Sequence, residues 1–118
     1  MPETVNVRIF DVVGSPLCVS SADGDLVHAK ILPLLREGRN VALSFAQVET
    51  LISAFLNAAI GQLYGEFSEE KIRAQLTVCD MTQEDLALLK RVVDNAKAYF
   101  RDPQRFKQAV KEVTGDEE

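Results

Sequence analysis

Apolar positions recur along the chain with two periods, one typical of strands and one typical of helices, so we expect an α/β fold. Residues 5–13 begin by alternating apolar and polar side chains and are rich in β-branched residues, as strands are. Gly14, Ser15 and Pro16 have the composition of a turn, and a second apolar run follows at 17–20. These features predict a β-hairpin.

The segment after this hairpin is predicted to be a helix that ends near residue 38. Asp23 or Asp25 can accept hydrogen bonds from its first turn, and Gly38 occupies the position of a C-terminal stop. Pro33 lies inside this helix and is expected to bend or shorten it.

Two short apolar runs, 41–45 and 76–79, predict further strands, and the first is expected to be central in the sheet. Between them, Ser53 is expected to cap a helix over residues 54–64, which contains only two strongly polar side chains. A helix that is apolar nearly all round has two surfaces to bury, and a sheet covers only one. We therefore expect this helix to leave apolar surface for a partner or for a second copy of the chain.

Two more helices have clear start signals. Ser68 precedes two acidic residues, an order that the dipole at a helix start favours. Thr82 is a capping residue for the longest predicted helix, which spans residues 83–101. The apolar stripe that should face the core along this helix consists of Leu86, Leu89, Val93, Ala96 and Phe100.

Together these elements predict a four-stranded mixed β-sheet with helices packed mainly on one face. Residues 1–101 are expected to form this domain. Asp102 and Pro103 can end one helix and start another, so residues 102–118 are expected to form a C-terminal helical extension with an acidic tail.

Length and composition agree with one globular domain, because the chain has 118 residues of which 47% are hydrophobic. No apolar run reaches the roughly 18 residues of a membrane span. The N-terminal residues do not resemble a signal peptide, so we expect a cytoplasmic protein without a membrane partner. Cys18 and Cys79 are then expected to be two buried thiols and not a disulfide.

Charge is distributed unevenly along the chain. The net charge of -5 makes nucleic acid an improbable partner for the domain as a whole. However, residues 90–111 contain seven basic side chains and two acidic ones, with three aromatic side chains among them. This segment is either a solvated helix face or a docking surface, and it supports an alternative function as an adaptor for nucleic acid or an acidic protein.

Motifs of catalysis are missing from the sequence. It has no Gly-rich phosphate loop, no paired Cys or His metal spacing and no nucleophile elbow. The single histidine, His28, has no Cys or Ser at helical spacing and is expected to be an ordinary exposed side chain. We therefore expect a non-enzymatic protein with no catalytic residues, metal or cofactor.

Five segments of the chain carry a resemblance to a known family. They lie at residues 41–45, 48–51, 53–61, 66–71 and 84–92. In these segments the chain resembles the STAS-like domains, which are relatives of the bacterial anti-sigma factor antagonists. This resemblance implies an α/β fold and a regulatory protein-interaction module in a signalling system, with a histidine-kinase-like ATPase as its partner.

The resemblance also implies a modification site. In the STAS antagonists, a serine at the start of the second helix accepts a phosphate from the partner ATPase, and the phosphate blocks complex formation. That serine corresponds to Ser53, whose other interpretation is a helix cap worth about 1 kcal/mol. The loop and the second helix would then contact the partner through Gln47, Thr50, Ser53, Leu56, Asn57 and Ile60.

Overall fold

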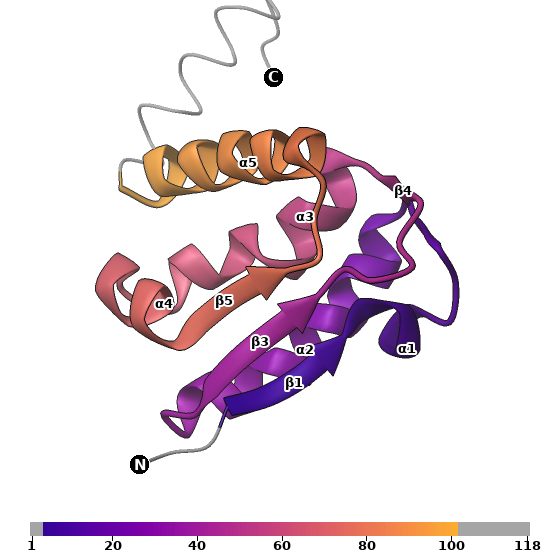
Figure 1. The fold of residues 1–118 in the computed structure, drawn as a ribbon. Coiled ribbons are helices and arrows are strands. Elements are labelled where there is room, and N and C mark those ends of the chain that lie inside the picture. Colours follow the sequence, from indigo (N-terminus) through magenta and orange to yellow (C-terminus); the bar gives the residue numbers. More distant parts are fainter. Residues whose placement is uncertain (1–3, 102–118) are drawn as a thin grey trace, which may run out of the picture.

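Three parallel strands form the main sheet of the protein, in the order β1-β3-β5 (Figure 1). The structure is a computed structural model, and it describes residues 4–101. Its elements are β1 Thr4–Arg8, α1 Ile9–Val13, β2 Leu17–Cys18, α2 Ser21–Arg36, β3 Asn40–Ser44, β4 Thr50–Leu51, α3 Ser53–Ala59, the 3₁₀ helix η1 Gly61–Gly65, α4 Glu69–Gln75, β5 Leu76–Cys79 and α5 Gln83–Arg101.

The α/β class is confirmed, but the predicted four-stranded mixed sheet is wrong. Strands β1, β3 and β5 are parallel, and β3 is central, with Leu43 paired to Val7 on one side and to Val78 on the other. The remaining two strands, β2 and β4, form a separate parallel pair. The structure therefore contains two small parallel sheets within the described residues.

The predicted hairpin is also wrong. Residues after Arg8 turn into the short helix α1, which ends at Gly14 with a left-handed φ of 78°. The next strand does not return to β1. Instead, Cys18 pairs with Leu51, and the amide of Glu49 donates a hydrogen bond to the carbonyl of Pro16 over 2.8 Å. A contact with a distant strand therefore replaces the local pairing that the sequence suggested.

Helices α2 and α3 cover one face of the three-stranded sheet. Side chains alternate across a strand, and Val7, Leu43 and Val78 point into the core while Ser44 and Cys79 lie on the more exposed face. Helices α2 and α3 lie behind the strands in Figure 1. The core therefore lies between the sheet and these helices.

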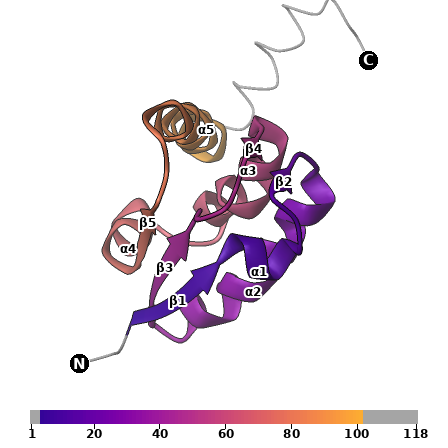
Figure 2. The same ribbon diagram turned by 45° about the vertical axis from the view of Figure 1, so that its right-hand side comes forward.

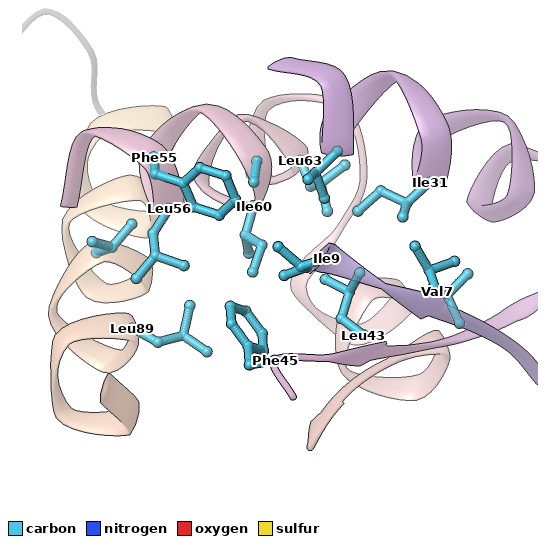
Figure 3. Close-up of a cluster of buried hydrophobic side chains, with 14 of the residues drawn as sticks. Val7, Ile9, Ile31, Leu43, Phe45, Phe55, Leu56, Ile60, Leu63 and Leu89 are labelled. Carbon is cyan, nitrogen blue, oxygen red and sulfur yellow. The ribbon is translucent and has the colours of Figure 1, made fainter. Parts of the chain in front are cut away.

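Helix α3 is the centre of the helical layer. It contacts α2 on one side and α5 on another, and α5 lies beside it at the end of the molecule away from the start of β1 (Figure 1, Figure 2). Figure 3 shows Leu89 of α5 pointing toward Phe45 and Leu56. The predicted helix over 54–64 is divided at Ile60 into α3 and η1.

Both ends of α2 follow from the residues that flank it. The side chain of Ser20 accepts from the amide of Asp23, so this serine and not Asp23 or Asp25 caps α2. Gly38 follows the end of α2, as predicted, and its φ is 81°. Helix α2 continues through Pro33 to Arg36, so this proline does not end it.

Two further caps are confirmed. The hydroxyl of Ser68 accepts from the amide of Lys71, and that of Thr82 accepts from the amide of Asp85. Helix α5 is the longest among residues 4–101. Its predicted stripe is buried only in the middle, because Leu86 is 45% exposed and Phe100 is 39% exposed. The predicted extension over 102–118 lies outside the described residues.

Candidate functional site

Ser53 is the first residue of α3 and lies at the surface. The prediction that it caps this helix is wrong, because the capping position belongs to Ile52, which has no side-chain hydrogen bond to the first turn. The Ser53 hydroxyl makes no hydrogen bond within residues 4–101. Its oxygen is therefore accessible and not used to hold the helix.

The other predicted contact residues divide into two groups. Gln47, Thr50 and Asn57 are exposed and flank Ser53 along the chain. Leu56 and Ile60 are 0% and 2% exposed, so the prediction that they contact a partner is wrong. Both point into the core because α3 is covered on two sides, by α2 and by α5.

The loop that leads to Ser53 is fixed to the end of the sheet. Gln47 has a left-handed φ of 68°, and its side-chain oxygen accepts a hydrogen bond from the Arg8 guanidinium. The Ser44 hydroxyl donates to Asp80 over 2.7 Å and accepts from the amide of Ala46 over 3.2 Å. These bonds connect the ends of β1, β3 and β5, so the loop has a defined conformation.

A groove of about 490 Å³ begins at Ser53 and runs between α3 and α5. Its floor contains the buried residues Gly61, Val92 and Ala96. Exposed amide side chains such as Asn57 form its rim. Sequence reasoning missed this groove, because its second wall comes from a helix that is about 40 residues further along the chain.

Glu69 is a charged centre that the sequence did not predict. Its carboxylate lies 3.3 Å from the Lys97 ammonium, 3.1 Å from the Arg101 guanidinium and 3.8 Å from that of Arg73. The hydrogen bond from Lys97, followed by that from Arg101, lowers the pKa of Glu69 below its usual value. This cluster connects the start of α4 to the end of α5.

The same contacts bear on the basic segment 90–111. Glu69 forms ion pairs with two of its basic side chains, Lys97 and Arg101, and Lys90 pairs with Asp94 over 3.3 Å. Residues beyond Arg101 lie outside the described part of the chain. These ion pairs reduce the free positive charge available for a phosphate backbone, and the adaptor alternative stays a prediction.

His28 is buried, so the prediction of an ordinary exposed histidine is wrong. Its Nε2 atom lies 3.5 Å from a carboxylate oxygen of Glu66 and has no hydrogen bond. The other oxygen of Glu66 accepts from Arg36 over 3.1 Å. Glu66, which follows η1, therefore packs on the side of α2 that carries His28. The apolar pattern of α2 alone does not show that another segment covers this side.

The two cysteines are free and occupy different environments. Cys18 is buried, and burial, with a smaller contribution from the charge of Asp23, raises its pKa to about 11. Cys79 is exposed, which corrects the prediction of two buried thiols. Its pKa is also raised, first by desolvation and then by the hydrogen bond with Asp80. Neither environment produces the stabilised thiolate of a nucleophile.

Within residues 4–101, no group of three or more His, Cys, Asp or Glu side chains could hold a metal ion. None of the helices in that part of the chain is long and apolar enough to cross a membrane.

A family model described as a STAS-like domain of unknown function (DUF4325) matches residues 23–86, more than half of the chain. The chain belongs to this family. The resemblance found in the sequence is thus confirmed at the level of the family. The part that matches this STAS-like domain includes Ser53, its loop and the α3 wall of the groove. The chain matches no curated protein and no solved structure.

Proposed function

We propose that this STAS-like domain is a non-enzymatic, cytoplasmic regulatory module that binds a protein partner. The contact surface consists of Gln47, Thr50, Ser53 and Asn57, and phosphorylation of Ser53 switches binding off. The likeness to anti-sigma factor antagonists points to a histidine-kinase-like ATPase as the partner that also supplies the phosphate.

The observation that carries this proposal is the accessible, unbonded hydroxyl of Ser53. A phosphoacceptor must reach the active site of a kinase, which a hydroxyl engaged in a helix cap does less readily. No acidic residue occupies the first turn of α3 to repel an incoming phosphate. A free serine at this position of the family motif therefore supports the role of acceptor.

The surroundings of Ser53 explain how a phosphate would act as a switch. Residues 50–65 contain no charged side chain. A phosphate adds about two negative charges at neutral pH, so it would be the dominant charge on this surface. Burying that charge against an uncharged partner surface is costly, because the phosphate loses its hydration and gains no counter-charge in return. Phosphorylation would therefore oppose docking.

Two substitutions test the proposal by calorimetry with the partner protein recovered from the native organism. Ser53→Asp introduces a negative charge and should weaken binding at least about tenfold, or 1.4 kcal/mol. Ser53→Ala keeps the surface uncharged and should bind nearly normally. Equal affinities for the two variants would contradict the switch.

Ala74→Asp is a charge control, because Ala74 is an exposed residue of another helix. It lies on α4, outside the proposed surface, and should leave affinity unchanged. Mass spectrometry of the protein after incubation with the partner and ATP should place the phosphate on the peptide that contains Ser53. A phosphate on another serine would overturn the assignment.

A further inference from the structure

Strand β5 is an edge strand, and its outer side pairs with no other strand within residues 4–101. The amide of Phe45 donates to the carbonyl of Cys79 over 3.0 Å, so the backbone groups of Cys79 face β3. In a parallel ladder the backbone groups of the neighbouring residue point the other way, so the amide and carbonyl of Val78 face outward. An unpaired edge of this kind is a template for another extended chain.

A small pocket of about 200 Å³ lies beside this edge, between β5, α4 and α5. Its floor consists of the buried residues Ile60, Ile72 and Leu89. Leu76 and Val78 of β5 form one side of it and are only partly buried. The pocket is left open because α5 packs mainly on α3 and η1 and not along β5 (Figure 1).

The size of the pocket indicates what it can hold. Sites for drug-sized molecules usually enclose about 300–1,000 Å³, so this pocket is too small for such a ligand and suits an apolar side chain of a bound polypeptide. Successive side chains of a strand point to opposite faces of the sheet. Every second side chain of a strand added to β5 would therefore point to the pocket side, where Leu76 and Val78 lie.

Cationic side chains lie at the rim of the pocket. Arg73 and Lys97 line it, and Arg101 lies beside them, paired with Glu69 over 3.1 Å. The three cations share the one carboxylate of Glu69, while Asp94 is paired elsewhere on α5. This excess of positive charge favours an acidic side chain on the occupant, because complementary charges select between partners.

We propose that β5 and this pocket bind an extended segment of a partner protein as an additional strand of the sheet. The segment carries an apolar side chain that enters the pocket and, two residues away on the same face, an acidic side chain that meets Arg73 and Lys97. Main-chain hydrogen bonds to Val78 provide affinity, and the pocket and the cations provide sequence preference. The surface is separate from Ser53, so this inference goes beyond the function proposed above.

A synthetic peptide of about seven residues tests this proposal. It carries glutamate and two valines at alternate positions and threonine at the others, so one face of the strand is acidic and apolar. Amide NMR spectra of the full chain follow its titration to millimolar concentration, and the largest shifts are expected in β5. The amide of Val78 should exchange with solvent several-fold more slowly in the complex, whereas that of Thr77, which faces β3, should be protected in both states.

Two control peptides separate the contributions. A peptide methylated on the backbone nitrogens that would face β5 cannot donate those hydrogen bonds and should not bind. A peptide with lysine in place of glutamate should bind several-fold more weakly, because it brings a positive charge to Arg73 and Lys97. Undiminished binding of either control would overturn the proposal, as would the absence of any shift in β5.

Two variants of the protein test the charge assignment. Arg73→Glu reverses one rim charge, so it should weaken binding of the glutamate peptide and strengthen that of the lysine peptide, each several-fold. Lys90→Glu is the matched control, because it makes the same change of charge on α5 outside the pocket, and it should leave both affinities nearly unchanged. Equal effects of the two variants would overturn the role of the rim cations.

Hydrogen exchange also distinguishes the other possible occupant. Protection of Val78 that appears without peptide and rises with protein concentration would assign the edge to a second copy of the chain and overturn a partner segment as its occupant. None of these assays contains the partner that recognises Ser53, so their failure leaves the Ser53 switch unaffected.

Discussion

Gly24 of α2 lies directly against the backbone carbonyl of Phe55 on α3. A β-carbon at Gly24 would clash with that oxygen and would lie 2.7 Å from the β-carbon of Ala58. Neither neighbour can rotate away, so Gly24→Ala must separate the two helices. We expect the free energy of unfolding to fall by about 1–3 kcal/mol, the usual cost of overpacking, as measured by urea denaturation.

Gly61→Ala is the matched control. A β-carbon there would meet the side-chain oxygen of Asn57, which is exposed and can move, while the β-carbon of Ala96 lies at 3.7 Å. This variant should unfold at nearly the wild-type urea concentration. Similar losses for both variants would contradict the close approach of α2 to α3 as the cause.

The elements with local signals were predicted well from the sequence. Helix α5 has a capping Thr82 and an apolar stripe within its own residues, and β3 is a short apolar run bounded by polar residues. The hairpin prediction was wrong because it also used only local signals, namely the alternating residues and the turn between them. The observed partner of Cys18 is Leu51, which lies far along the chain. Pairing over such a separation depends on tertiary packing, which β-propensity does not contain.

Helix α3 shows the same limit for the site. Its nearly complete apolar surface indicated a partner, but α2 and α5 of the same chain cover most of it. The pattern correctly required a second covering surface and could not identify which element supplies it. Of the predicted contact residues, only the polar ones remain accessible. A groove between α3 and α5 is also accessible.

Ser53 and Ser68 should respond differently to loss of the hydroxyl. Ser68 is a true cap, because its side chain accepts from the amide of Lys71 over 3.1 Å. Ser68→Ala should therefore cost about 1 kcal/mol of stability. Ser53→Ala should cost clearly less, since its hydroxyl bonds to no first-turn amide. Urea denaturation of both variants checks this order, and an equal loss would restore Ser53 as a cap.

The two thiols should differ in reactivity. Cys79 is exposed, whereas Cys18 is buried and has a pKa of about 11. A thiol reagent used near pH 8 should modify Cys79 first, because Cys18 is shielded and almost fully protonated there. Addition of denaturant should release a second reactive thiol. Cys79→Ser should abolish the first phase alone, and rapid labelling of that variant in its native state would contradict the burial of Cys18.

Glu69 should make the stability of the protein depend on pH in the acid range. Lys97 and Arg101 hold its pKa below the usual value in the folded state. A carboxylate whose pKa is lower when folded stabilises the protein above its unfolded pKa, and this contribution is lost as pH falls through the folded pKa. Glu69→Gln should therefore lower Tm at neutral pH and have a smaller effect in acid.

Glu70→Gln is the matched control for this last experiment. Glu70 is the next residue in the first turn of α4, and it has no ion pair within residues 4–101. Both substitutions remove a charge that interacts with the helix dipole, so the difference between them isolates the contacts with Lys97 and Arg101. Thermal unfolding of both variants across the acid range measures it. If the two Tm values fall equally at neutral pH, the cluster does not hold the end of α5 to α4.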